Sequence, residues 1–136
     1  MKYNGVVQRK LALLNTQVLR LEESLKDVSF SEFEESWILR SMAERALQVA
    51  AEIIIDVAER ILALEKSGPA ATAAEAIESL VSLGVLESSQ PYADITRFRN
   101  LIVHQYEEID PVILFDLSKK RLDDFRKFRD EIDALE

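Results

Sequence analysis

The side chains best suited to act on a phosphate group lie within ten consecutive positions of this sequence. They are two arginines, the only histidine of the chain, an asparagine and a tyrosine: Arg97, Arg99, Asn100, His104 and Tyr106. No acidic residue lies among them, although the formal net charge of the chain is −8 at pH 7. The segment is therefore a local cluster of positive charge in an acidic protein.

These side chains suit the cleavage of a phosphodiester bond without a metal ion. A histidine titrates near neutral pH, so it can deprotonate a ribose 2′-OH or protonate a leaving oxygen. An arginine offers fixed hydrogen-bond donors to the charge that develops on the phosphate. Under this hypothesis, Asn100 orients the imidazole of His104 or binds the phosphate.

Helical geometry decides which of these residues can meet. Arg97, Asn100 and His104 are spaced by three and four residues, so they share one face of a helix. Arg99 precedes His104 by five residues, which is roughly 140° around the helix axis. The long Arg99 side chain could wrap back, the helix could distort, or the histidine could belong to a second subunit. The apolar residues share another face and can be buried: Ile95, Phe98 and Ile102.

Structural roles are an alternative for each of these residues. A lone histidine near a helix end often caps the helix or bonds to its neighbours, and composition alone favours that role for His104. Tyr106 could pack its ring while its hydroxyl faces water. Arg97 could face solvent, or it could contact RNA or a protein partner.

Composition narrows the classes of protein to which the chain can belong. Its 136 residues predict one domain, residues 1–136, and include 17 Lys and Arg, 25 Asp and Glu and no cysteine. Without cysteine and with one histidine, thiol nucleophiles, thiolate zinc sites and multi-histidine metal sites are excluded within one subunit. The acidic balance disfavours a coat of nucleic acid. No signal-peptide core and no apolar run near ~20 residues are present, so we expect a cytoplasmic protein without membrane or DNA partners.

Few glycines and prolines interrupt the chain, so long helices should position the polar segment. Apolar spacings of three and four predict a first helix over residues 6–26. A capping box at Ser31 and Glu34 predicts a second helix that runs to Lys66 and ends through a left-handed Gly68. Its apolar residues form two adjoining stripes, which indicates packing on several sides. Trp37 is interpreted as core or dimer-interface packing.

Three further helices follow from the remaining start and stop signals. Thr72 and Glu75 predict a capping box for a helix that ends at Gly84. A fourth helix is predicted from Ser88 or Ser89 through His104, and Asp110-Pro111 predicts the start of a fifth. The charge run Lys119-Lys120-Arg121 is interpreted as a solvated face of that last helix. Together these elements predict an all-α, up-and-down bundle of about five helices.

The polar segment and its flanks resemble a known family. Arg99-Asn100, followed by three residues, His104, one residue and Tyr106, is similar to the signature of HepT-like toxins in the HEPN superfamily. Residues 44–48 (Glu-Arg-Ala-Leu-Gln), residues 83–86 (Leu-Gly-Val-Leu) and Ile109-Asp110 also resemble that family at similar spacing. The resemblance covers most of the chain and implies a HEPN-like helical fold.

The resemblance implies a metal-independent endoribonuclease that is the toxin of a type II/VII-like toxin–antitoxin pair. Family members form homodimers that bring two Arg-His sets into one cleft, which would solve the angular problem of Arg99. The antitoxin is a minimal nucleotidyltransferase that needs Mg²⁺ and ATP and transfers AMP to the tyrosine of the motif, here Tyr106. The toxin itself is implied to need no cofactor.

Site roles are carried over by position. His104 would be the general acid or base, Arg99 the donor to the phosphate or transition state, and Asn100 a supporting group. Arg97 also fits the permitted spacing, but Arg99 is preferred because the family places a polar residue directly after the arginine. Two other functions remain open: a non-catalytic subunit that binds a nucleotide or a nucleotidyltransferase, and a purely structural bundle.

Overall fold

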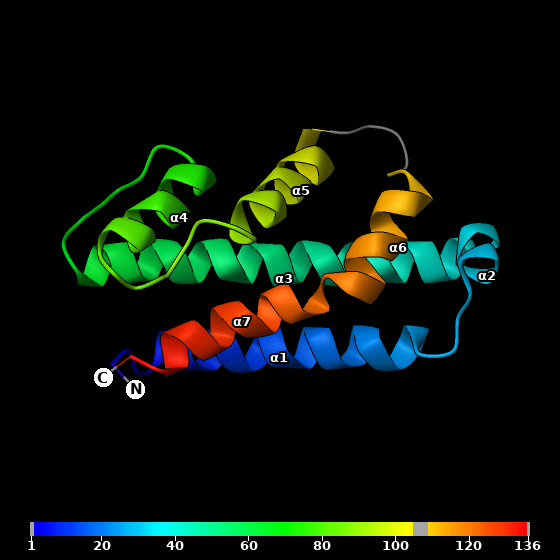
Figure 1. The fold of residues 1–136 in the computed structure, drawn as a ribbon, viewed down its shortest axis with the longest axis horizontal. Helices are drawn as coiled ribbons and strands as arrows, with labels where there is room; N and C mark the ends of the chain where they lie inside the picture. The colour runs from blue at the N-terminus through cyan, green and yellow to red at the C-terminus, as the bar shows by residue number, and fades with distance from the viewer. Residues whose placement is uncertain (1, 105–108, 136) are drawn as a thin grey trace.

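The computed structural model describes residues 2–104 and 109–135, and for Val103 and His104 it describes the backbone alone. The described residues form helices and no strand (Figure 1). The predicted all-α bundle is therefore confirmed, but the described part of the chain holds seven helices where about five were expected. Their bounds are α1 Val6–Leu25, α2 Phe30–Glu35, α3 Trp37–Leu64, α4 Ala73–Ser82, α5 Tyr92–His104, α6 Pro111–Lys120 and α7 Leu122–Asp133.

The long helix α3 is the axis of the bundle and contacts each of the other six helices (Figure 1). In this view α1 and α7 lie below α3, α4 and α5 lie above it, and α6 crosses it. The two ends of the chain meet, because the backbone N–H of Lys2 donates to the carbonyl of Leu135 over 2.8 Å. No described helix combines the length and the hydropathy that a membrane crossing requires.

Apolar periodicity predicts the buried faces well. The α1 stripe is buried as expected: Leu11, Leu14, Val18, Leu21 and Leu25. On α3, the deeply buried stripe includes Ala43, Leu47, Ala50 and Ile54, whereas Leu39 and Met42 are only partly buried. Because α3 has neighbours on several sides, both of the adjoining stripes predicted for it pack against other helices.

The second predicted helix is two helices, and its capping box lies two residues earlier than predicted. The Ser29 hydroxyl accepts the N–H of Glu32, and the Glu32 carboxylate accepts the N–H of Ser29. The backbone then breaks at Ser36 (φ −97°, ψ 104°), whose hydroxyl caps α3 by accepting the N–H of Leu39. The sequence offers a serine and a glutamate three residues apart at both registers, so local pattern alone could not choose between them.

The predicted stop at Gly84 is confirmed, whereas two other helix ends differ from the prediction: α5 begins at Tyr92 and not at Ser88 or Ser89, and α3 ends through another residue than Gly68. Gly84 (φ +78°) ends α4, and the N–H of Val85 returns to the carbonyl of Leu80 over 2.9 Å. At the end of α3, however, the residue with left-handed backbone is Lys66 (φ +55°), not Gly68. The N–H of Ser67 bonds the carbonyl of Leu62 there, so the chain has already turned before it reaches the glycine.

The last predicted helix is also divided. Asp110 caps α6 as predicted, because its carboxylate accepts the N–H of Val112 over 2.9 Å. The helix is interrupted at Arg121 (φ −112°, ψ 7°), which has neither glycine nor proline as a neighbour. The direction of the chain changes there, and α7 turns the buried residues Leu122, Phe125, Phe128 and Ile132 toward the core.

Candidate active site on helix α5

Helix α5 presents the polar segment because its apolar face is anchored in the core. Ile95 and Phe98 are buried, and Ile102 packs against the core, as the spacing predicted. At the start of the helix, the fully buried Tyr92 donates its hydroxyl to Glu131 of α7 and packs edge-on against Phe128, with ring centroids 5.4 Å apart. Burial, reinforced by the Glu131 carboxylate, raises the pKa of Tyr92, so the phenol stays protonated.

Arg97 lies on the exposed face of α5, where it meets a carboxylate of its own helix. Its guanidinium pairs with Oδ1 of Asp94, and 67% of its side chain is exposed to solvent. The other oxygen of Asp94 accepts from Arg121 over 3.1 Å, and Arg121 also donates to Asp124 over 2.6 Å. Asp94 therefore ties the first half of α5 to the corner between α6 and α7.

Arg99 differs from Arg97 in its surroundings. Its side chain is half-buried, and Nη1 lies 3.4 Å from the Oδ1 atom of the exposed Asn100. Its Nε is buried and finds no hydrogen-bond partner among the residues that the structure describes. The Nε end of the Arg99 guanidinium is therefore buried, while Nη1 lies beside the exposed side chain of Asn100.

The structure brings only some of the predicted site residues together. Arg97 and Asn100 share the exposed face as predicted, and Arg99 contacts Asn100. His104 is the last residue of α5, and its side chain is outside the described part. Tyr106 lies outside the described residues. The meeting of arginine and histidine therefore stays a prediction.

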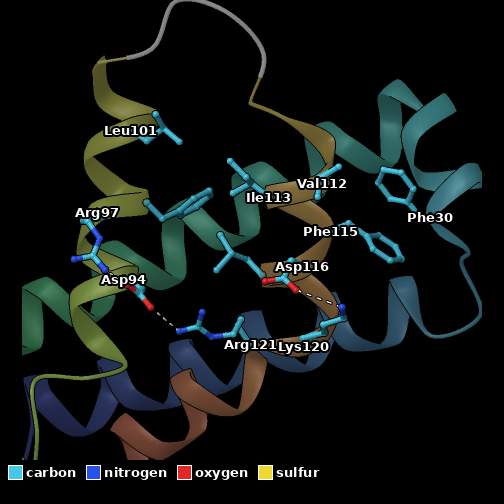
Figure 2. Close-up of a pocket in the computed structure, with 12 residues that line it drawn as sticks. Phe30, Asp94, Arg97, Leu101, Val112, Ile113, Phe115, Asp116, Lys120 and Arg121 are labelled. Atoms are coloured by element: carbon cyan, nitrogen blue, oxygen red, sulfur yellow. Dashed lines mark hydrogen bonds and ion pairs between the residues drawn. The ribbon is translucent and has the colours of Figure 1, made fainter.

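A groove between α5 and α6 borders this face and was not predicted from the sequence (Figure 2). Its volume is about 770 Å³. Apolar side chains form one part of it, including Leu101 of α5 and Val112 and Ile113 of α6. Charged side chains line the rest of it: Asp94 and Arg97 on α5, and Asp116, Lys120 and Arg121 near the α6–α7 corner.

The basic run at the end of α6 has more specific roles than the solvated face that was predicted. The ammonium of Lys119 donates a hydrogen bond to the carbonyl of Leu25 over 2.5 Å. Leu25 is the last residue of α1, and the helix dipole favours a cation at a helix C-terminus. Arg121 pairs with Asp94 and Asp124. Lys120 alone matches the prediction, because 75% of its side chain is exposed while it pairs with Asp116 at 3.6 Å. The charge run was the available signal, but only the fold shows which carboxylates it meets.

The structure also tests the role expected for Trp37. Trp37 is 66% exposed at the start of α3, so the prediction that it belongs to the core is wrong, and its place in a dimer interface stays a prediction. Within the described residues, no group of three or more histidine, aspartate or glutamate side chains is placed to hold a metal ion.

Comparison with known proteins shows which protein family the chain matches. The model of a family described as "Ribonuclease HepT-like" matches residues 14–132. The chain is 29% identical over 112 residues to a protein named tRNA nuclease HepT from Aphanizomenon flos-aquae, covering 81% of this chain and 76% of that one. It is 25% identical over 135 residues to mRNA nuclease HepT from Shewanella oneidensis, covering 96% and 98% of the two chains.

Solved structures share the fold. One is described as a tri-AMPylated Shewanella oneidensis HEPN toxin in complex with an MNT antitoxin; its TM-score is 0.85, with 24% identity, 98% of this chain and 100% of that chain covered. Another, described as a toxin–antitoxin with AMP-PNP, has a TM-score of 0.84 and 24% identity, covering 97% of this chain and 100% of that one. These values show that this chain has the same fold as those two proteins.

Proposed function

This chain belongs to the ribonuclease HepT-like family, and from that premise we propose that it is an endoribonuclease acting as the toxin of a type II/VII-like toxin–antitoxin pair. The observation that carries the proposal is the family match over residues 14–132, which contains all of α5 and its polar face. Two similar proteins are named as nucleases of tRNA and of mRNA, which supports RNA as the class of substrate. Residues 1–136 would act as a single domain.

The chemistry we propose uses three side chains of α5. His104 acts as general acid or base on the ribose 2′-OH or the leaving oxygen. Arg99 donates hydrogen bonds to the phosphate as its negative charge develops, and Asn100 steadies the Arg99 guanidinium, from which its Oδ1 atom is 3.4 Å away. Arg97 has a supporting role, since it is held by Asp94. The reaction proceeds without a metal ion.

A homodimer would complete the site. Arg99 and His104 are separated by roughly 140° around a regular helix, and both lie within α5. A second α5 placed against the first would let the arginine of one subunit face the histidine of the other. Under this arrangement each cleft combines residues of both subunits, and the positive charge of two α5 helices is concentrated in an otherwise acidic dimer.

The proposal is tested by incubating the purified protein with RNA in excess EDTA. We expect cleavage to continue at the rate seen without the chelator, because histidine and arginine replace the metal ion as acid, base and electrostatic stabiliser. Gel analysis of end-labelled RNA measures the rate, and a metal-dependent ribonuclease treated in parallel shows that chelation is complete. Loss of cleavage in EDTA, restored by added Mg²⁺, would contradict the metal-free mechanism.

Control of the toxin would be covalent. We propose that a minimal nucleotidyltransferase antitoxin, using Mg²⁺ and ATP, transfers AMP to Tyr106. A similar solved protein is described as a tri-AMPylated HEPN toxin in complex with an MNT antitoxin, which supports this mode of inhibition. Adenylyl phosphates beside His104 would fill the cleft and repel the phosphate of an RNA.

Replacement of Tyr106 by phenylalanine should abolish AMP addition. After co-expression with the proposed nucleotidyltransferase antitoxin, the intact mass of the wild-type protein should increase by whole AMP units, while that of Tyr106→Phe should not change. The substitution removes only the hydroxyl that attacks the α-phosphate of ATP. Tyr3→Phe is the matched control and should be modified like the wild type, because the Tyr3 hydroxyl is already hydrogen-bonded to Glu65 over 2.8 Å. AMP masses on Tyr106→Phe would place the acceptor elsewhere.

A non-catalytic subunit that binds a nucleotide or a nucleotidyltransferase is the alternative. It rests on the same face of α5 and on the groove beside it. Under this alternative, the purified protein binds its partner and leaves RNA intact. Cleavage in EDTA that is lost in both Arg99→Ala and His104→Ala would reject it.

A further inference from the structure

We propose that the α5–α6 groove is a nucleotide subsite, which holds the base and phosphate of an RNA residue adjacent to the bond that is cut. The inference rests on the proposed ribonuclease function and names the part of the substrate that this surface takes. It assigns a role to Leu101, Ile113 and Lys120, none of which belongs to the Arg-His signature.

The shape of the groove suits a flat, largely apolar group. Its volume of about 770 Å³ is open between Leu101 of α5 and Val112 and Ile113 of α6, and Val112 is 59% exposed (Figure 2). Phe30 and Phe115 line it as well, in an edge-on pair with ring centroids 5.4 Å apart. Unpaired RNA bases are held against apolar and aromatic side chains in this manner.

Oriented cations at the other part of the groove suit the phosphate. The exposed guanidinium of Arg97 is fixed by Asp94, and the exposed ammonium of Lys120 is 3.6 Å from Asp116. A guanidinium has five N–H donors, so one carboxylate leaves some of them for a phosphate oxygen. The three carboxylates Asp94, Asp116 and Asp124 equal in number the three local cations. The phosphate would therefore be held by positioned donors and not by bulk positive potential.

The groove lies beside the motif, and its charged side chains favour RNA over an apolar surface of a second protein chain. Leu101 lines it three residues before His104, so the groove and the motif share one helix and lie within a few ångströms along its axis. An apolar partner surface would cover Arg97 and Lys120, both mostly exposed, without giving them new acceptors, which is costly. A nucleotide supplies an apolar face and acceptor oxygens together.

Binding of an uncleavable RNA tests the subsite separately from catalysis. The probe is a short, fluorescein-labelled single strand with 2′-O-methyl riboses, and its affinity is measured by fluorescence anisotropy. Ile113→Trp, which fills the groove, should weaken binding about tenfold. Arg97→Gln should weaken it about fivefold and lower the slope of log K against log salt by about 0.7, the value for one phosphate contact in a single strand.

Matched controls lie outside the groove. Leu19→Trp enlarges an exposed leucine of α1, and Arg126→Gln removes an arginine of α7 that pairs with Glu22 and Asp123; both should keep the affinity within about twofold. If circular dichroism shows that Ile113→Trp does not fold, Val112→Asp at the exposed rim takes its place.

Each result decides the proposal. Weakened binding that is confined to the groove variants supports the proposal. It does so even if the wild type fails to cut ordinary RNA, because that failure would refute the nuclease function and not the subsite. Equal affinity in all variants, or no binding by the wild type, overturns it. The proposal is also overturned if a groove variant loses RNA binding and its dimer dissociates in sedimentation, because the groove would then be an interface between two copies.

Discussion

Replacing His104 with alanine is expected to reduce the rate of RNA cleavage about 10²- to 10⁴-fold, the usual contribution of a positioned general acid or base. Growth of cells that express the chain without its antitoxin should recover in parallel, because toxicity would follow cleavage. The chain has one histidine, so no second imidazole of the same subunit can substitute for it. Cleavage of a defined RNA under single-turnover conditions measures the effect on the chemical step.

A loss of fold must be separated from a loss of chemistry. His104 ends α5, beyond the buried anchors Tyr92, Ile95 and Phe98, so the truncation should leave the helical circular dichroism and the melting temperature nearly unchanged. Binding of the 2′-O-methyl RNA should also persist, since that probe offers no proton for a base to remove. Equal cleavage or equal toxicity of His104→Ala would exclude His104 as the catalyst and favour the structural role that composition alone suggests.

Helix positions could be predicted from the sequence where one local signal dominated. The α1 stripe from Leu11 to Leu25 and the stop at Gly84 depend on periodicity and on a positive φ, both of which a short window encodes. The start of α2 was misplaced because Ser29 and Ser31 each have a glutamate three residues later. Phe33 resolves the choice, since it is buried against Phe115 of α6 with ring centroids 5.1 Å apart, a contact between segments far apart in sequence.

The break between α6 and α7 shows the same limit more strongly. Arg121 is an ordinary helix former, and nothing beside it interrupts a helical pattern. Its backbone leaves the helix where its side chain bonds Asp94 of α5 and Asp124 of α7. The tertiary ion pair with Asp94 and the burial of Leu122 and Phe125 thus override local propensity, and local spacing could not reveal either of them.

Likewise, only part of the candidate site could be predicted from the sequence. The shared exposed face of Arg97 and Asn100 and the buried face of Ile95 and Phe98 follow from helical spacing alone, and the structure confirms both. The groove beside them requires α6, which is brought against α5 by the fold and not by proximity of motifs. Sequence spacing therefore predicted the polar and buried faces of α5 but not the groove proposed to hold the neighbouring nucleotide.

The two arginines of α5 should differ in their effects on catalysis, and this difference identifies the one that acts on the phosphate. Arg99 is half-buried with a buried Nε, whereas the Arg97 side chain is 67% exposed and paired with Asp94. A guanidinium that is already packed in place stabilises a transition state without the cost of reorganisation. We therefore expect Arg99→Ala to lower kcat about 10²- to 10³-fold, and Arg97→Ala to act mainly on KM.

Arg99→Lys sharpens the test because it keeps the charge and removes the planar fork of donors. It should recover little of the lost kcat, since a lysine ammonium cannot reproduce bidentate hydrogen bonding to a phosphate. Arg126→Ala, which removes an ion-paired arginine of α7 away from this face, should retain the wild-type kcat and controls for the change in net charge. The opposite pattern, a large loss of kcat in Arg97→Ala and a small one in Arg99→Ala, would assign the catalytic role to Arg97. The spacing of Arg97 and His104, with six residues between them, would then be the functional one, and the free energy that orients the guanidinium would come from Asp94 instead of from burial.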